Sequence, residues 1–265
     1  MNGSTWKLFD RLSADYDEVV PFFASFGAAI MATIDPPPGT RLLDLGAGRG
    51  ALTAPALARG CHVTAIDAAP GMVRRLAATY PDAEVHTMDA QALTLADNSF
   101  DVVASAFVIH LLDDPAAGVA EAYRVLKPGG RFAFTGASER SKGGPTVSAP
   151  DELGVRLNEL FAEFTAYLPP NGSIGTWNDA ADMLEDAGFV DLREDFAEVA
   201  IPFDDAEALW RWSLTHGYRA FIDDLPDARR AEFHDRMLAL QAKDFVLRRV
   251  NPVWSGRKPP PRKTV

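Results

Sequence analysis

Apolar positions along the chain change their spacing near residue 40, and the change separates two kinds of structure. Between residues 6 and 34 they recur at helical spacing, and the run stops at Pro36-Pro37-Pro38-Gly39, which breaks a helix. From Arg41 onward, short apolar runs alternate with amphipathic stretches. Five of these runs predict strands, roughly at residues 41–45, 62–66, 83–87, 100–106 and 130–136. Strands that alternate with helices indicate a parallel sheet with right-handed crossovers.

The rest of the chain departs from this regular alternation. Residues 139–178 combine a polar loop rich in Gly, Ser and Pro with a helix rich in aromatic side chains. The alternation then returns, with a helix at 179–187, a strand from Phe189, helices at roughly 205–222 and 227–243, and a last strand near 245–255. We therefore expect an α/β fold: a Rossmann-like, doubly wound, seven-stranded sheet, mostly parallel with an antiparallel last strand, and helical cap insertions.

Composition and charge exclude several classes of partner. No apolar run is long enough to span a bilayer, residues 1–10 lack the layout of a signal peptide, and the single cysteine, Cys61, fits a reducing compartment. We therefore expect a cytoplasmic protein without a membrane partner. The 26 basic and 37 acidic residues give a net charge of −11, which disfavours binding to nucleic acid. The C-terminal basic cluster is interpreted as a frayed, solvated end; it consists of Arg257, Lys258, Arg262 and Lys263.

The most informative local signal is a strand that ends in a glycine-rich turn, Leu42-Leu43-Asp44-Leu45-Gly46-Ala47-Gly48-Arg49-Gly50. Such a turn lets the backbone approach a ligand closely, and its residues also satisfy the looser pattern of dinucleotide-binding proteins. Asp44 suits the ammonium of a methionine moiety and would repel a pyrophosphate. Asp67 ends the next predicted strand, where a carboxylate accepts hydrogen bonds from the ribose hydroxyls in either class of protein. A nicotinamide-dependent oxidoreductase therefore remains an alternative, and Asp44 argues against it.

From about residue 10 to residue 137 the chain resembles the class I S-adenosylmethionine-dependent methyltransferases, particularly the ubiquinone/menaquinone-type and natural-product small-molecule methyltransferases. Besides the glycine turn, the matching motifs are Ala14-Asp15-Tyr16-Asp17, Met88-Asp89-Ala90, Phe100-Asp101-Val102-Val103 leading to Ala106-Phe107, and Leu126-Lys127-Pro128-Gly129-Gly130. The resemblance implies that S-adenosylmethionine (SAM) is bound and leaves as S-adenosylhomocysteine (SAH). Arg49 departs from the family pattern, because smaller residues are often found at its position.

The resemblance also implies which residues contact SAM. Asp67 would bind the ribose, Asp89 the exocyclic amine of the adenine, and the ring of Tyr16 would cover the methionine group. The full set assigned to the cofactor is Tyr16, Asp44, Gly46, Ala47, Gly48, Asp67, Ala68, Met72, Met88, Asp89, Ala90, Ala106 and Phe107. No set of His, Asp and Glu residues has a spacing that indicates a metal site.

Methyl transfer needs alignment more than acid–base chemistry, because the sulfonium of SAM already activates the methyl group. His110 follows the fourth predicted strand, at the edge of the sheet where ligands bind, and is the candidate general base. The alternative is a histidine that packs under the cofactor or bonds to the backbone. His216 either faces the pocket from the insertion or packs within a helix. Aromatic side chains in the additions, among them Phe22, Phe161 and Trp212, favour a planar or lipophilic acceptor.

These features predict one structural domain in four segments. The segments are an N-terminal helical lid at 1–38, a SAM-binding core at 39–138, a cap insertion at 139–178, and residues 179–265, which complete the sheet and contain inserted helices at 205–243. We expect methyl transfer to O, N or C of a small, apolar or aromatic metabolite, carried out by a monomer or homodimer. The alternative is a methyltransferase-like protein that binds SAM and catalyses a cyclisation or rearrangement without methyl transfer.

Overall fold

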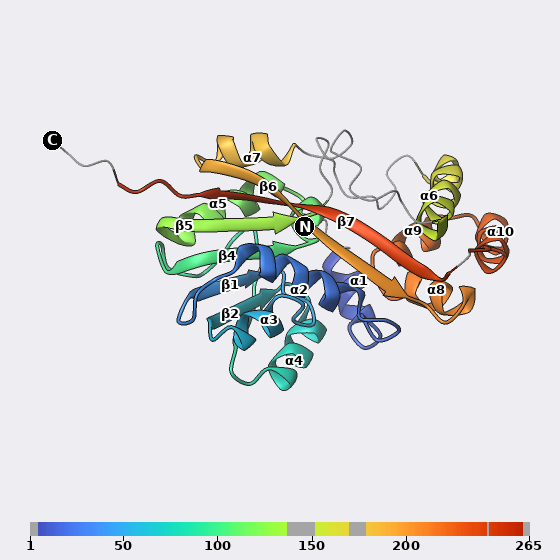
Figure 1. Cartoon of the computed structure of the whole chain (residues 1–265), viewed down its shortest axis with the longest axis horizontal. Coiled ribbons are helices and arrows are strands. Elements are labelled where there is room, and N and C mark those ends of the chain that lie inside the picture. The colour runs from blue at the N-terminus through green and yellow to red at the C-terminus, as the bar shows by residue number, and fades with distance from the viewer. Residues whose placement is uncertain (1–4, 137–151, 170–178, 243, 262–265) are drawn as a thin grey trace.

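The computed structural model describes residues 5–136, 152–169, 179–242 and 244–261, and its centre is a seven-stranded sheet (Figure 1). The strands are β1 (Arg41–Leu45), β2 (His62–Asp67), β3 (Glu84–Thr87), β4 (Phe100–Ala106), β5 (Leu126–Thr135), β6 (Val190–Pro202) and β7 (Val246–Arg257). Their order across the sheet is β3-β2-β1-β4-β5-β7-β6. Strands β1 to β5 pair in parallel, and β7 is antiparallel to both of its neighbours. The predicted fold class is therefore confirmed, including the antiparallel last strand.

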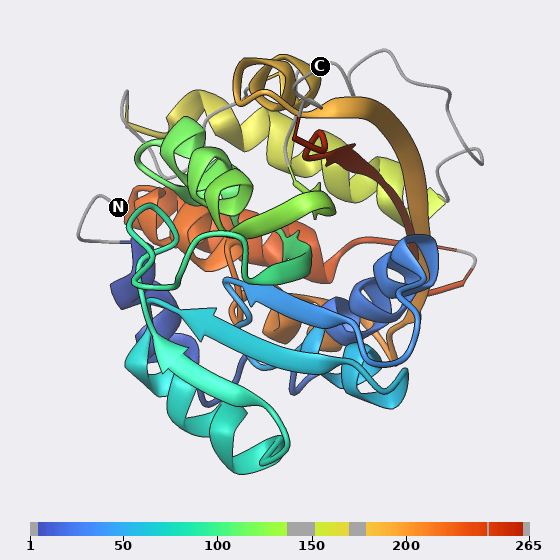
Figure 2. The ribbon, with the colours of Figure 1, turned by 90° about the vertical axis from the view of Figure 1, so that its left-hand side faces the viewer.

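Helices cover both faces of the sheet, because the strands carry apolar side chains on both sides. In β1, Leu42 belongs to the apolar cluster on one face and Leu43 to the cluster on the other. The helices that contribute to these clusters are α2 (Phe22–Ile34), α3 (Thr53–Ala58) and α4 (Pro70–Thr79) on the Leu42 face, and α5 (Pro115–Val125) and α7 (Ala180–Asp186) on the Leu43 face. The view turned by 90° shows the twist of the sheet between these helices (Figure 2).

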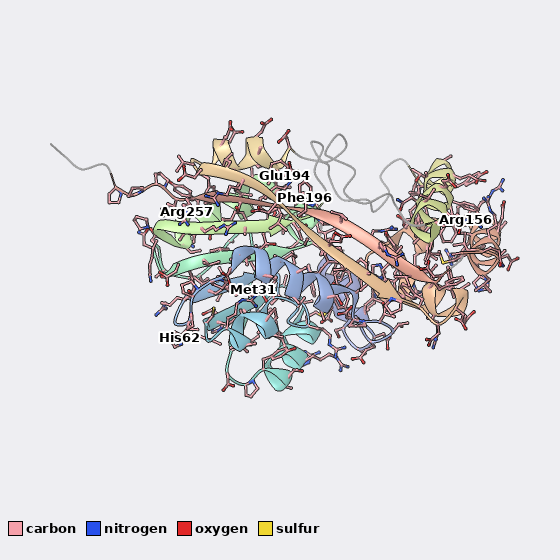
Figure 3. The ribbon with its side chains drawn as sticks, viewed as in Figure 1. Met31, His62, Arg156, Glu194, Phe196 and Arg257 are labelled. Atoms are coloured by element: carbon pink, nitrogen blue, oxygen red, sulfur yellow. The ribbon has the colours of Figure 1, made fainter. Side chains whose placement is uncertain are left out.

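Strands β6 and β7 continue beyond the end of β5 and reach a second group of helices. The pairing of β5 with β7 ends at Thr135 opposite Val253, whereas β6 and β7 stay paired as far as Pro202 opposite Val246. Four helices gather at this end of the hairpin and are called the cap: α6 (Glu152–Phe164), α8 (Ala206–Ser213), α9 (Tyr218–Asp224) and α10 (Asp227–Leu238) (Figure 1). Figure 3 places Arg156 of the cap and Arg257 of β7 at opposite ends of the molecule. The hairpin thus carries the cap toward the side at which the parallel strands end.

The helix predicted over residues 205–222 is two helices in the structure, α8 and α9. Between them, Thr215 Oγ1 donates a hydrogen bond to the carbonyl of Trp212 at 2.8 Å, and His216 Nδ1 bonds to the same carbonyl at 2.9 Å. Side chains that occupy a backbone carbonyl compete with the N–H group that would continue the helix. The last predicted helix is also shorter, because α10 ends at Leu238 and not at residue 243.

The N-terminal run of helical spacing also forms two helices, α1 (Thr5–Leu12) and α2. The loop between them ends where Asp17, at a φ of +60°, caps α2 by accepting hydrogen bonds from the N–H groups of Phe23 and Ala24, each at 2.9 Å. Helix α1 is tied to α4 by Asp10, whose carboxylate accepts a hydrogen bond from the Gly71 N–H. These two anchors hold the intervening loop against the carboxyl edge of the sheet.

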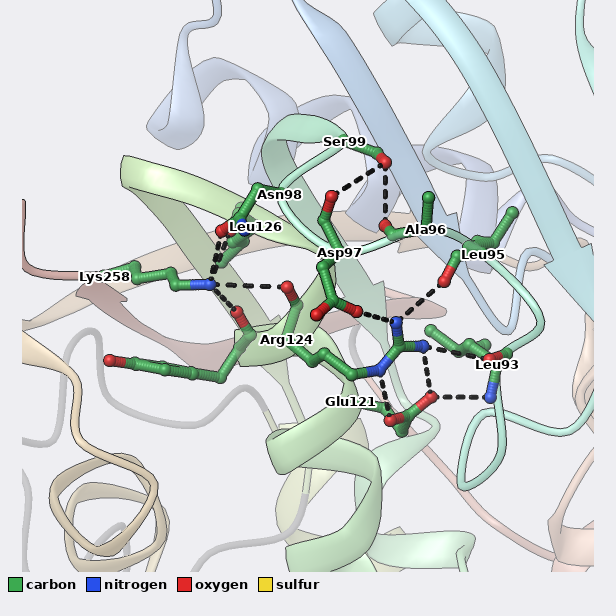
Figure 4. Close-up of polar contacts among 11 residues, drawn as sticks. Leu93, Leu95, Ala96, Asp97, Asn98, Ser99, Glu121, Arg124, Leu126 and Lys258 are labelled. Atoms are coloured by element: carbon green, nitrogen blue, oxygen red, sulfur yellow. Dashed lines mark hydrogen bonds and ion pairs between the residues drawn. The ribbon is translucent and has the colours of Figure 1, made fainter.

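The basic C-terminal cluster contains a residue with a structural role, so its interpretation as a frayed end is wrong for Lys258. Its ammonium donates to the carbonyl oxygens of Tyr123 and Leu126, at 2.9 and 2.8 Å, and to the Asn98 side chain at 2.9 Å (Figure 4). A cation at this place compensates carbonyl groups at the end of α5 that have no partner within the helix. Next to it, Arg124 joins α5 to the segment before β4 through an ion pair with Asp97 at 2.6 Å.

Parts of the predicted features lie outside the described residues, namely the polar loop within 139–178, and Arg262 and Lys263 of the basic cluster. The division into lid, core, cap insertion and completing segment stays a prediction. Within the described ranges, no helix has both the length and the apolar composition needed to cross a membrane.

Replacing Lys258 with Met should lower the free energy of unfolding by about 1–3 kcal/mol, because hydrogen bonds to a charged group are lost while the carbonyl groups stay half-buried. For a chain of this size the melting temperature should fall by several degrees, which thermal denaturation followed by circular dichroism would measure. The control is Arg75→Met, which removes an exposed cation from α4. Equal melting temperatures for the two variants would contradict the role of Lys258.

Candidate functional site

Strand β1 ends at the glycine-rich turn, and the packing of this turn requires glycine at its first position. Gly46 has a φ of +77°, and a Cβ atom there would lie 2.4 Å from Val108 Cγ2. The N–H groups of Gly46 and Ala47 both donate to the carbonyl of Ile66, at 2.9 and 2.8 Å. The turn is thereby joined to the end of β2, where the second predicted acid stands.

Asp67 is the last residue of β2, and its carboxylate is held from two sides. Oδ2 accepts a hydrogen bond from the Gly48 N–H at 2.8 Å, and Oδ1 accepts one from the Ala69 N–H at 2.8 Å. Burial raises the pKa of the Asp67 carboxyl, and the two N–H groups act in the opposite direction. The carboxylate is therefore fixed between the glycine turn and the start of α4.

Asp44 stands on β1 with its side chain buried, at 1% exposure. Thr53 Oγ1, at the start of α3, donates a hydrogen bond to Asp44 Oδ2 at 2.7 Å. Burial raises the pKa of the Asp44 carboxyl to about 7, and the bond from Thr53 opposes this shift. Asp44 consequently gains its proton near neutral pH, where an ordinary carboxyl is fully ionised.

Two adjoining cavities surround the glycine turn. The first measures about 640 Å³, its open mouth included, and the predicted residues in its wall are Tyr16, Gly46, Gly48, Asp67, Ala68, Met72, Met88, Ala90, Ala106 and Phe107. The second measures about 630 Å³, and the predicted residues in its wall are Tyr16, Asp44, Gly46, Ala47, Gly48 and Ala106. Because Tyr16, Gly46 and Gly48 belong to both walls, the two cavities meet at the turn. The fold thus brings almost all of the predicted cofactor residues together.

Tyr16 stands in the loop between α1 and α2, where both cavities meet. Its ring stacks on Phe23 with the centroids 4.8 Å apart, and burial raises the pKa of its phenol well above the ordinary value. Arg49 of the glycine turn donates to the carbonyls of Ala14 and Tyr16, at 3.2 and 3.1 Å, and pairs with Glu18 at 2.6 Å. Arg49, the residue that departs from the family pattern, therefore holds the loop that carries Tyr16 against the glycine turn.

Asp89 and His110 are the predicted site residues that line neither of these cavities. The Asp89 carboxylate accepts hydrogen bonds from the backbone N–H and the side-chain amide of Gln91, at 2.9 and 3.0 Å. His110 lies in the 3₁₀ helix η1 (Ile109–Leu111), where burial lowers the pKa of its imidazole to about 4. Its Nδ1 has no partner among the described residues, and a Cβ atom on Gly136 would lie 2.5 Å from it. The roles of Asp89 and His110 stay predictions.

Several wall residues were missed by the sequence reasoning. Thr5, Trp6 and Phe9 of α1 line the first cavity. The helical spacing of apolar residues between 6 and 34 indicates helices, but it does not show which face of each helix packs against the sheet. Within the described part of the chain, no group of three His, Cys, Asp or Glu side chains lies close enough to hold a metal ion.

Comparison with known proteins places this geometry in a family. Residues 43–134 match the methyltransferase domain family. Over 240 residues the chain is 32% identical to the nocamycin O-methyltransferase of Saccharothrix syringae, which covers 84% of this chain and 86% of that protein. It is 30% identical over 203 residues to a demethylmenaquinone methyltransferase of Renibacterium salmoninarum, covering 69% and 85% of the two chains. A putative methyltransferase from Bacillus halodurans shares the fold, with a TM-score of 0.56, 21% identity, and 88% and 98% of the two chains covered.

The matches to these relatives extend well beyond the glycine turn that methyltransferases share with dehydrogenases. The nicotinamide-dependent alternative is therefore set aside, and SAM is the methyl donor with SAH as its product. The chain belongs to the class I SAM-dependent methyltransferase family.

Proposed function

We propose that this methyltransferase acts on an O, N or C atom of a small, planar and largely apolar metabolite. The observation that carries the proposal is a continuous series of aromatic rings that runs from the cavity walls into the cap. Phe107, in the wall of the first cavity, meets Phe23 edge-on at 5.6 Å, and Phe23 meets the ring of His216 at 5.5 Å. Aromatic walls favour flat, apolar ligands through stacking and edge-to-face contacts.

The series continues through the cap. Trp212 lies 5.5 Å from the ring of Tyr218, which in turn lies 4.4 Å from Phe161. These rings come from α6, α8 and α9, so the series extends through three cap helices, with Trp212 itself buried at 1% exposure. The two named relatives, a nocamycin O-methyltransferase and a demethylmenaquinone methyltransferase, support a small-molecule acceptor.

The residues around the glycine turn fit SAM by their chemistry. Asp67 would accept hydrogen bonds from the ribose hydroxyls, because each oxygen keeps a lone pair beyond the one used by the backbone N–H. Asp44 would pair with the ammonium in the second cavity, and Tyr16 would cover the methionine group between the cavities. When bound, SAM supplies the activated methyl group, and the task of the protein is to align the acceptor with it.

The proposed acceptor class is tested by measuring SAH release from purified enzyme and SAM. Naphthol, naphthylamine and hydroxyanthraquinone represent planar acceptors, and glycine and ethanolamine represent small polar ones. We expect SAH to form with at least one planar compound and not with the polar ones. Release with the polar compounds alone would contradict the aromatic acceptor, and SAM binding without SAH release from any compound would favour the rearrangement chemistry.

Replacing Asp67 with Ala should weaken SAM binding at least tenfold, because each hydrogen bond to a charged group contributes about 1.5–3 kcal/mol. Asp67→Asn keeps one acceptor oxygen and should have an intermediate dissociation constant in calorimetric titration. Asp82→Ala is the control, since Asp82 is exposed beside β3 at the opposite edge of the sheet. An unchanged dissociation constant for SAM in Asp67→Ala would show that the ribose does not bind to this carboxylate.

The affinity for SAM should fall as the pH is lowered through about 7, because a protonated Asp44 cannot pair with the ammonium. Binding below this pKa must expel the proton, so the dissociation constant should rise about tenfold for each pH unit well below 7. Titration calorimetry between pH 5 and 7 measures this slope. In Asp44→Asn the affinity should be low throughout, with a flatter slope; an equally steep slope in this variant would assign the titration to another group.

A further inference from the structure

Arg49 is, among the described residues, the one basic side chain in the walls of the two cavities. The charged groups that share the wall of the second cavity with it are the carboxylates of Asp17 and Asp44, and the charged group of the first cavity is Asp67. Asp17 already accepts hydrogen bonds from the N–H groups at the start of α2. An anionic part of a ligand in these cavities therefore finds a single cationic partner, the guanidinium of Arg49.

The guanidinium of Arg49 uses one of its nitrogen atoms for contacts within the protein. Nη1 donates to the carbonyl oxygens of Ala14 and Tyr16, at 3.2 and 3.1 Å, and lies 2.6 Å from Glu18 Oε1. Nε and Nη2 have no hydrogen-bond partner in the part of the chain that the structure describes. These two nitrogens form a planar edge of the guanidinium, and such an edge binds a carboxylate through two parallel hydrogen bonds.

The backbone of the glycine turn offers few donors to an anion, because most of its N–H groups already donate to oxygen atoms of the protein. The residues whose N–H groups are used in this way are Gly46, Ala47, Gly48 and Gly50, at distances of 2.8 to 2.9 Å. An anion beside the turn consequently depends on a side-chain donor. Arg49 belongs to the same turn and lines the second cavity, so it can supply that donor.

The methionine end of SAM carries two opposite charges on one carbon atom, an ammonium and a carboxylate. The proposed function assigns the ammonium to Asp44 in the second cavity, which leaves the carboxylate without a partner. Because the two groups share a carbon atom, the carboxylate must enter the cavity that holds the ammonium. Taking a carboxylate out of water without a partner is costly. The wall of this cavity must therefore contain a donor for it, and Arg49 is the cationic residue of that wall.

We propose that Arg49 binds the α-carboxylate of SAM through Nε and Nη2 while Nη1 stays bonded to the loop that carries Tyr16. One guanidinium then contacts both the ligand and the loop that covers it, so the binding of SAM and the position of Tyr16 are linked. The ion pair with Glu18, whose side chain is 57% exposed, contributes little by itself. This inference rests on the proposed function, which places the methionine group beside Asp44, and it gives a binding role to the residue that departs from the family pattern.

The test measures, by calorimetric titration, the dissociation constants of SAM and of decarboxylated SAM, which lacks only the α-carboxylate. The unchanged enzyme should bind SAM about 10–100-fold more tightly than the decarboxylated compound, the usual effect of hydrogen bonds between charged groups. In Arg49→Met this preference should disappear, because only SAM loses a partner. Arg49→Lys keeps the positive charge without the planar edge and should retain part of the preference. A loss of the contacts to the Tyr16 loop alone would weaken the two compounds alike and leave their ratio unchanged.

The matched control is Arg59→Met, because the Arg59 side chain has a similar exposure, 30% against 25% for Arg49, and lines neither cavity. It should keep the full preference for SAM. A preference that persists in Arg49→Met, or one that is absent from the unchanged enzyme, would overturn the proposal. These titrations contain no methyl acceptor, so they are independent of the acceptor class. Failure of every planar compound to release SAH would contradict the proposed acceptor and would leave the carboxylate preference as measured.

Discussion

The hydrogen bond from the Gly48 N–H to the carboxylate of Asp67, 2.8 Å long, is the interaction on which the rest of the site depends. It joins the turn after β1 to the end of β2. Gly48 and Asp67, at the ends of two neighbouring strands, are therefore held at a fixed distance from each other. The approach is possible because Gly46 has no side chain to collide with Val108. Arg49 then extends the same turn outward and fixes the loop that carries Tyr16. The conformation of the glycine turn thereby positions Gly46, Gly48 and the Tyr16 loop, which contribute to the walls of both cavities.

The helices around the glycine turn and the helices of the cap share a single apolar cluster. Helix α2 contacts both groups, since Phe26 meets Phe107 just after β4 at 5.2 Å and Phe22 meets Trp212 of the cap at 4.9 Å. The contact of α2 with the residue after the glycine turn is so close that a Cβ atom on Gly27 would lie 1.8 Å from the Ala51 carbonyl oxygen. Helix α2 therefore packs closely against the segment after the glycine turn and against the cap at the same time.

The fold was predictable because its signals are local and repeated. Apolar runs separated by helices indicate a parallel sheet, and the order of the motifs identified its type. What escaped the sequence reasoning depends on contacts between distant segments. Lys258 has the composition of a frayed tail, and only the fold shows that it meets the end of α5. The break at His216 comes from side chains that bond to one carbonyl, and the position of Trp6 in a cavity wall depends on where α1 docks.

The placement of α1 has a practical consequence for anyone who works with this enzyme. Because Thr5 and Trp6 belong to the wall of the first cavity, a bulky group attached to α1 would lie beside the mouth of that cavity. The C-terminal end of β7, at Arg257, lies at the other end of the molecule from the cap (Figure 3). A surface attachment or reporter joined beside Arg257 therefore leaves the cap open to solvent.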